Sequence, residues 1–443
     1  MSVLGFICAV IVTGLAYMVP QRWGLVPLLI GATCVPHSQE LELGTLHFGV
    51  VRLVVLAGLL RVIVKREHID GGLHVLDRLM IVWGIWYVAS SVFHTDNSTL
   101  TRFGEIYTDL GIYFLARVFL RDHTDIVRLF KIVCWLIVPV ALFMLEERMT
   151  GHNLFSTLFG ESQGTEYRHG HYRAHGPFAI AITAGTVGAV CLPMALYFWH
   201  GERKVALAGL FGAGGIVYAS GASGPVMTAI SVLGALTLWK IRDRLRAIRW
   251  LVLFILIVLN LVMSDPVYFL IARIDITGGS TGYYRAALIQ AAIRHFNEWW
   301  LIGTDYTKDW LLGGGGVASP NHTDITNHFI AMGIAGGLLL MLLFMGVLYA
   351  AFSLIGRVLK LDRVSSASDP FLAWTLGSIL FAHAVTFLSV SYFDVANIAY
   401  FYLLLGTIGA VYAAALEETS LRLDDEQVDL EPEPQAVTAD SKS

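Results

Sequence analysis

The chain has 443 residues, of which 56% are hydrophobic and only 14% are charged. Soluble domains carry about 25% charged residues, so this composition excludes a water-soluble fold, which needs far more polar surface. The formal net charge is −4, but much of the negative charge lies between Glu417 and Ser443, and the rest of the chain is mildly basic.

Apolar runs of membrane-spanning length follow one another along most of the sequence. A spanning helix needs about 20 apolar residues, and continuous apolar runs without strand-like alternation exclude a transmembrane β-barrel. We therefore predict an all-α polytopic membrane protein, a bundle of about 12–14 transmembrane helices. The candidate spans are 2–20, 23–36, 47–64, 76–93, 103–120, 127–146, 177–199, 204–220, 222–239, 249–264, 326–354, 371–391 and 395–415.

Linkers rich in lysine and arginine alternate with linkers that are poor in them. Because cytoplasmic linkers carry the excess of these residues, the poor linkers face outward, and they include the two longest loops, 147–176 and 265–325. If every candidate span crosses, the N-terminus lies outside, and if one early hairpin does not cross, both ends lie inside. The basic linkers are 65–78, 121–131, 200–204, 240–249 and 357–363.

The C-terminal segment 417–443 is acidic, contains Pro432 and Pro434, and has few large apolar residues. Such a segment cannot bury enough apolar surface to fold. We therefore expect a transmembrane helical domain over 1–416 and a disordered acidic cytoplasmic tail over 417–443. The four cysteines lie in apolar stretches and are expected to be small buried hydrophobic residues.

The outward loop 147–176 is rich in histidine and arginine, including Arg168 and Arg173. Its histidine spacing matches no pair of ligands one helical turn apart, and acidic partners are sparse, so no metal site is expected. Two interpretations stay open, a polar loop exposed to water or a cationic patch that binds an anionic headgroup. Arginine suits a diphosphate because its planar guanidinium makes paired, charge-assisted hydrogen bonds.

The outward loop 265–325 is too long for a passive connection, and ordered loops of this length tend to be functional. Within it, 283–300 has helical character and places Arg285 and Arg294 on opposite faces. We expect Arg285 to point toward the bundle, and the alternative is that both arginines extend to lipid headgroups. The fold class is thus a helical bundle with a large periplasmic loop that contains short helices.

Four polar residues precede the next long apolar span: His322, Asp324, Asn327 and His328. Polar groups at the mouth of a span are costly to bury, so we interpret this cluster as a functional site. A histidine suits general acid–base chemistry near neutral pH, and Asp324 would orient an imidazole. The alternative is that Asp324 or Thr326 only caps the helix that follows.

Small and polar residues also interrupt the spans near the outer face. The segment 220–225 is rich in glycine and serine, and it either packs helices together or forms a turn. Asp394 and Asn397 lie near the start of the last span, where they either line a polar cavity or form a turn.

Three segments occur in a set order between about residue 173 and residue 343. They are Arg173-Ala-His-Gly176 before a span, Arg285 at the start of a loop helix followed by Trp300-Leu-Ile-Gly303, and the loop histidine His322 upstream of Gly333. In this order and topology they resemble the O-antigen ligase/polymerase family of bacterial envelope glycosyltransferases.

The chain departs from the family pattern at two places. Thr323, rather than asparagine, follows His322, and an asparagine comes later, at Asn327 before His328, so the choice between the two histidines stays open. The turn at 222–225 also lacks the family's basic residue.

The resemblance implies glycosyl transfer at the outer face of a bacterial inner membrane. The donor would be a glycan on undecaprenyl diphosphate, the acceptor would be a glycan, lipid or protein hydroxyl, and no metal or other cofactor would take part. No nucleic acid partner is expected. The implied catalytic residues are His322, His328 and Asp324, and the implied substrate-binding residues are Arg168, Arg173, Arg285 and Asn327.

The alternative function is a transporter or flippase for a lipid-linked glycan or a small solute. Transporters favour charged or helix-breaking residues near the bilayer midplane. Here the middle of the spans looks nearly free of charge, and the polar residues gather at one face. The sequence therefore favours an enzyme over a transporter, and also over a purely structural subunit, which would not need the long loop.

Overall fold

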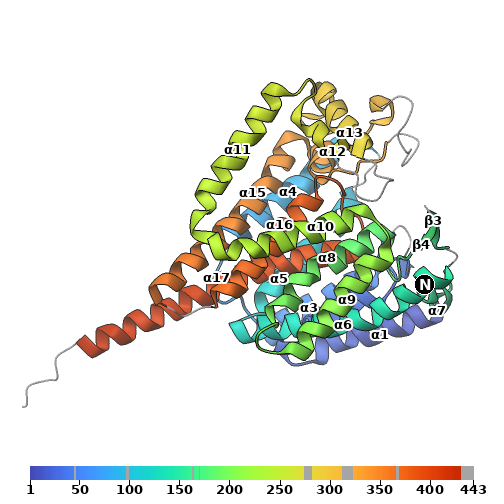
Figure 1. Cartoon of the computed structure of the whole chain (residues 1–443). Helices are drawn as coiled ribbons and strands as arrows, with labels where there is room; N and C mark the ends of the chain where they lie inside the picture. Colours follow the sequence, from blue (N-terminus) through green and yellow to red (C-terminus); the bar gives the residue numbers. More distant parts are fainter. Residues whose placement is uncertain are drawn as a thin grey trace, which may run out of the picture.

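The computed structural model describes residues 1–43, 46–95, 99–161, 164–168, 170–273, 282–311, 323–365 and 369–430. Within these ranges the chain is mainly α-helical, and most helices pack side by side in one bundle (Figure 1). The α-helices are α1 (Val3–Met18), α2 (Val26–Cys34), α3 (Val50–Lys65), α4 (Val75–Ser90), α5 (Thr99–Phe119), α6 (His123–Thr150), α7 (Leu154–Phe159), α8 (Ala181–Tyr197), α9 (Arg203–Ser220), α10 (Ser223–Thr237), α11 (Leu245–Val262), α12 (Leu270–Arg273), α13 (Gly282–Arg294), α14 (Phe296–Trp299), α15 (His328–Ser365), α16 (Pro370–Thr386) and α17 (Val395–Leu430). The 3-10 helices are η1 (Gln21–Trp23), η2 (Ser91–Phe93), η3 (Leu238–Arg244), η4 (Val267–Phe269) and η5 (Lys308–Trp310). Two antiparallel hairpins pair β1 (Glu40–Leu43) with β2 (Leu46–Gly49) and β3 (Glu166–Arg168) with β4 (His171–Arg173).

Five helical stretches of the described chain are long and apolar enough to cross a membrane. The shorter apolar helices α1, α8 and α16 accompany them. This architecture agrees with the prediction of a helical membrane protein, whereas the count of about 12–14 spans and their sidedness stay predictions. The five stretches are Val75–Phe93, His123–Thr150, Ser223–Val262, His328–Leu361 and Val395–Leu421.

Helix α9 packs closely against both α6 and α8, with small residues at the contacts. A Cβ added at Gly209 would lie 2.7 Å from both the Ala195 Cβ and the Cys134 Sγ. Small residues of this kind let membrane helices approach closely and gain dispersion contacts. Cys134 and Cys191 are fully buried there, as expected, whereas the other two cysteines are half-buried.

Helix α15 breaks at Gly336 and Gly337, and the long loop contacts it at this break. Gly337 has a φ of 75°, and a Cβ added to it would lie 2.3 Å from the Leu301 carbonyl oxygen. The Leu338 amide donates a hydrogen bond of 2.8 Å to the carbonyl oxygen of Trp300. The break therefore exposes backbone groups that bind the loop, and it fixes the loop against α15.

The structure also describes parts of the long loop and of the C-terminal segment. The loop contains the short helices α12, α13 and α14, and the last two cover the helical region expected at 283–300. Helix α17 continues to Leu430 and so includes residues 417–430, the first part of the expected tail. Residues 431–443, the rest of the expected tail, lie outside the described residues.

Candidate functional site

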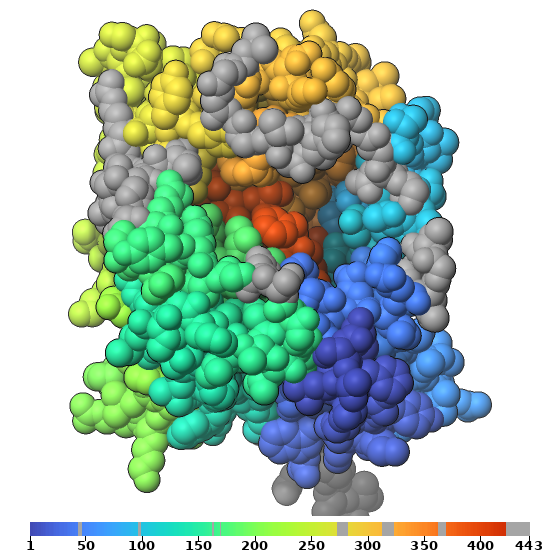
Figure 2. All heavy atoms as spheres, turned by 90° about the vertical axis from the view of Figure 1, so that its right-hand side faces the viewer, coloured from blue at the N-terminus to red at the C-terminus, as the bar shows by residue number. Residues whose placement is uncertain are grey.

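A cavity of about 320 Å³ lies between the first hairpin, α5 and the start of α17. Figure 2 shows the molecule hollowed on one face, with the first residues of α17 at the floor of the hollow. The described lining comes from α2, the β1–β2 hairpin, α3, α4, α5 and the starts of α15 and α17. Elements far apart in the sequence therefore build one polar space inside an apolar bundle.

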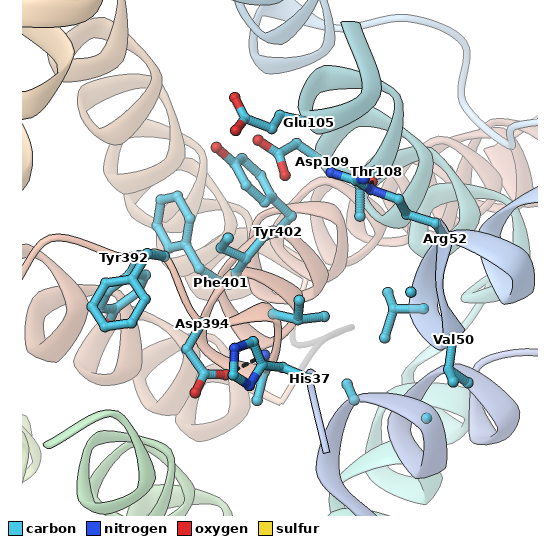
Figure 3. A pocket seen from close by; sticks show the side chains of 18 of the residues that line it. His37, Val50, Arg52, Glu105, Thr108, Asp109, Tyr392, Asp394, Phe401 and Tyr402 are labelled. Carbon is cyan, nitrogen blue, oxygen red and sulfur yellow. Dashed lines mark hydrogen bonds between the residues drawn. The ribbon is translucent and has the colours of Figure 1, made fainter. Parts of the chain in front are cut away.

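Two carboxylates on α5, Glu105 and Asp109, form one wall of the cavity (Figure 3). They are one helical turn apart, so their side chains lie on the same face of the helix. The Tyr87 hydroxyl donates to Glu105 Oε2 at 2.6 Å, and the Tyr402 hydroxyl donates to Asp109. Both carboxylates are partly exposed, and the space that they share is the cavity.

Arg52 supplies positive charge to the same wall. Its Nε donates to the Thr108 hydroxyl at 3.4 Å, and its Nη1 donates to the His47 carbonyl oxygen at 2.6 Å. Four carboxylates line the cavity against this one arginine and two histidines, so the described lining is acidic. The carboxylates belong to Glu40, Glu105, Asp109 and Asp394.

His328 lines the cavity at the start of α15, as one of the two histidine candidates. Its Nδ1 accepts a hydrogen bond of 3.3 Å from the Tyr392 amide, so the neutral imidazole carries its proton on Nε2. The ring packs against Phe387 at 4.7 Å and Phe344 at 5.0 Å between centroids. These contacts fix the ring in one orientation at the edge of the polar space.

The neighbours of His328 have other roles in the structure. Asn327 Oδ1 accepts from the Ile330 amide at 3.1 Å, and its Nδ2 donates to the Leu388 carbonyl oxygen at 3.2 Å. Asn327, rather than Asp324 or Thr326, therefore caps α15. The Asp324 side chain is exposed, and it is not part of the described cavity lining. The other histidine candidate, His322, and the glycine run at 313–316 lie outside the described residues.

The three predicted arginines do not line the cavity as far as the described residues define it. Arg168 is exposed on β3, and Arg173 is buried on β4, where its Nη1 donates to Glu166 Oε2 at 2.9 Å. Arg285 is half-buried on α13, and its burial lowers the pKa of its guanidinium. Among the described residues, the Nε groups of Arg173 and Arg285 are buried without a hydrogen-bond partner.

The segment after Arg173 is held by a buried carboxylate at the end of α6. Glu147 Oε2 accepts from the Gly176 amide at 2.8 Å, and Oε1 accepts from the Thr165 hydroxyl at 2.9 Å and the His175 amide at 3.2 Å. The His175 ring donates from Nδ1 to the Phe178 carbonyl oxygen at 2.9 Å. His175 is therefore structural.

In the part of the chain that the structure describes, no three His, Cys, Asp or Glu side chains cluster closely enough to hold a metal ion.

Asp394 satisfies both interpretations made from the sequence, because it lines the cavity and also forms a turn. Its Oδ2 accepts from the Ala179 amide at 2.7 Å and the Thr183 hydroxyl at 2.9 Å, and its Oδ1 accepts from the Ala396 amide at 2.8 Å. Asn397 Nδ2 donates to the Thr183 carbonyl oxygen at 3.3 Å. Three donors hold the Asp394 carboxylate, which therefore joins α8 to α17.

The expectation that the spans are nearly free of charge is wrong for α5. Besides its two cavity carboxylates, α5 carries Arg102, which donates to the Ala335 carbonyl oxygen at 2.6 Å, and Arg117, which pairs with Asp77 at 3.1 Å. Both arginines are fully buried. Charged residues inside a predicted span were the signal for this site, because such residues are rare and mark functional positions.

A histidine–aspartate pair holds the long loop against the segment that follows α4 and η2. Asp305 accepts from His94 Nδ1 at 2.5 Å, from the Thr95 amide at 2.6 Å and from the Thr95 hydroxyl at 3.0 Å. His94 Nε2 lies 2.8 Å from the Ile302 carbonyl oxygen, so each ring nitrogen faces an oxygen atom of the long loop. Burial raises the pKa of Asp305, but these hydrogen bonds outweigh it and bring the pKa below its ordinary value.

No protein-family model matches the sequence of this chain, and no curated protein matches it.

Proposed function

We propose that this chain is a glycosyltransferase of a bacterial inner membrane, of the O-antigen ligase/polymerase type. It polymerises or ligates oligosaccharide carried on undecaprenyl diphosphate at the periplasmic face, for exopolysaccharide or O-antigen assembly. The observation that supports this best is the polar cavity with two carboxylates, enclosed by apolar helices. A lipid-linked donor needs both environments, an apolar surface for its tail and a polar site for its sugar.

In this proposal Asp109 is the general base. The acceptor hydroxyl gives its proton to the Asp109 carboxylate as its oxygen bonds to the anomeric carbon of the donor. The bond between that carbon and the diphosphate oxygen breaks, and undecaprenyl diphosphate leaves with the electron pair. Tyr402 donates to Asp109 and Tyr87 to Glu105, so both carboxylates are held in place before the substrate binds.

The leaving diphosphate needs positive charge close to it. Arg52 lines the cavity and is the candidate within it. Arg173 and Arg285 each have one buried guanidinium N–H without a partner among the described residues, so each keeps a donor for an anion. The proposed site also includes Arg168 and one of the two histidines, His322 or His328.

The test is glycan assembly in cells that depend on this chain. Asp109→Asn keeps the size of the side chain but removes the base, so we expect polymer or ligated product to fall by about 10²-fold or more. Asp265→Asn, at an exposed position of the long loop, is the matched control and should assemble glycan normally. Normal product from Asp109→Asn at equal protein level would refute Asp109 as the base.

One observation favours the second candidate, a transporter or flippase of a lipid-linked glycan or small solute. Glu105 and Asp109 lie on a helix inside the bundle, and intramembrane carboxylates also occur in transport pathways. Liposomes with labelled lipid-linked glycan distinguish the two functions. Movement of the label across the bilayer without elongation would support transport, and elongation without movement would support the enzyme.

A further inference from the structure

A second pocket, far from the cavity in the fold, is lined mainly by basic side chains. It has a volume of about 450 Å³ and lies between η3, the start of α11, the end of α15 and the start of α16. Its lining contains four cations and one carboxylate: Arg242, Arg246, Arg249 and Lys360, and Asp243. The pocket therefore has excess positive charge and attracts an anion.

Two of the four cations are fixed by their own segment, and the other two have no partner among the residues that the structure describes. Arg242 lies over the Trp239 ring at 4.0 Å and donates to its carbonyl oxygen at 3.3 Å, while Arg249 Nε donates to the Leu245 carbonyl oxygen at 3.4 Å. Among the described residues, none of the four forms a salt bridge, and Arg246 and Lys360 are exposed to the pocket. Both are therefore available to a phosphate.

Aromatic residues beside the pocket indicate its depth in the bilayer. The rings of Trp239 and Trp374 lie 5.8 Å apart, and Trp374 Nε1 donates to the Ala235 carbonyl oxygen at 3.1 Å. Tryptophans gather at the level of the lipid headgroups, where an apolar ring and a polar N–H are both satisfied. The pocket also joins basic linkers, 240–249 and 357–363, at the end of the bundle expected to face the cytoplasm.

The helix that leaves this pocket, α11, is apolar from Trp250 to Val262 apart from Asn260, and it has no buried residue. Figure 1 shows it along the outer edge of the molecule. Trp250 is 67% exposed and Phe254 is 63% exposed, although both belong to a stretch apolar enough to span a membrane. A helix of this kind is covered by acyl chains, and these chains begin at the level of the basic pocket.

We propose that this pocket binds the headgroup of an anionic phospholipid, whose acyl chains lie along α11. Arginine and lysine side chains contact the phosphate, and basic pockets between membrane helices are known to select such headgroups. The lipid links α11 to α15 and α16, whose residues line the pocket together. The proposal does not depend on the proposed glycosyl transfer.

The test measures lipid retention on the purified full-length chain by native mass spectrometry. Phosphatidylglycerol and phosphatidylcholine with the same acyl chains are offered in equal amounts, and the wild type should prefer phosphatidylglycerol. Each basic residue near an anionic headgroup contributes about fivefold in affinity, so Arg246→Gln with Lys360→Gln should lower the preference by at least about tenfold. Arg357→Gln, an exposed basic position of α15 outside the pocket, should keep it.

Two further controls distinguish lipid recognition from misfolding and from the binding of a soluble anion. Arg246→Lys with Lys360→Arg preserves the charge and should keep the preference, which shows that loss in the glutamine variant is not misfolding. Equal retention of both lipids by the wild type, or an unchanged preference in the glutamine variant, would overturn the proposal. Stabilisation by inorganic phosphate that equals stabilisation by phosphatidylglycerol would assign the pocket to a soluble anion instead.

Discussion

Replacing Asp305 with alanine removes the carboxylate that connects the long loop to the end of α4. That carboxylate accepts one hydrogen bond from His94 and two from Thr95. Hydrogen bonds to charged groups contribute about 1.5–3 kcal/mol each when buried. Asp305 is 25% exposed, so each bond contributes less than this range, about 1 kcal/mol, and we expect a loss of about 3 kcal/mol for the three bonds.

A loss of about 3 kcal/mol raises the open fraction of the loop by roughly 10²-fold. Hydrogen–deuterium exchange reads this directly at two amides that the docked loop protects. Leu338 donates to the Trp300 carbonyl oxygen, and Thr304 donates to the Ile334 carbonyl oxygen. Both amides should exchange about 10²-fold faster in Asp305→Ala, while amides in the middle of α6 should not change.

The matched control for this variant is Asp309→Ala in the same loop. Asp309 accepts from the Tyr306 hydroxyl at 3.1 Å, and both side chains are exposed, so this contact contributes little. Exchange at the Leu338 amide should then resemble the wild type. Unchanged exchange in Asp305→Ala, or an equal increase in both variants, would refute the role of the His94–Asp305 pair in docking.

Two further predictions concern the same loop. Gly337→Ala should destabilise the docked state and lower the thermal midpoint, because Gly337 has a φ of 75° and its added Cβ would meet a loop carbonyl oxygen at 2.3 Å. The control is Gly346→Ala, which has open space around its Cβ and should keep the thermal midpoint of the wild type. Equal thermal midpoints for the two variants would contradict the reasoning. The pKa of Asp305 lies below its ordinary value of 3.8, so its contribution to docking is present above pH 3.8 and is lost as the pH falls through the lower, folded value. Exchange measured from pH 7 to pH 3, corrected for intrinsic rates, should show loss of protection only at the acidic end, and Asp305→Asn should abolish that transition.

The helices were predictable because hydropathy is a local property. The candidate span 103–120 corresponds to α5, which runs from Thr99 to Phe119, and the loop helix expected at 283–300 corresponds to α13 and α14. Each follows from the residues within one window of the sequence. The helical continuation of α17 past residue 417 was not predictable from composition, since a helix can extend from a packed segment into a polar one.

The cavity was less predictable because its parts meet only in the fold. Asp109 and Tyr402 are far apart in the sequence, and hydropathy averaging over α5 conceals two carboxylates among apolar neighbours. His328 was recognised because it precedes a span, which is a local signal. The sequence predicts substrate binding for Asn327, but its side-chain amide binds the Ile330 amide of α15 and the Leu388 carbonyl oxygen, and only the path of the chain reveals this.

The pairing of His94 with Asp305 had no sequence signal either. Both residues occur in loops of ordinary composition, and the break at Gly337 determines where the long loop meets α4 and α15. For the predicted arginines the sequence did give a signal, but that signal did not lead to the cavity. Arg173 and Arg285 were selected from a resemblance, and the described cavity lining includes neither of them.

Glycan elongation by the purified chain tests the central claim most directly. The full chain in lipid nanodiscs is given extracted undecaprenyl-diphosphate-linked oligosaccharide, and the products are separated by size. The account predicts a ladder of longer products with the wild type and with Asp265→Asn, and a rate lower by about 10²-fold or more with Asp109→Asn. Elongation by Asp109→Asn at the wild-type rate, or no elongation by the wild type together with transport of the same lipid in liposomes, would contradict it.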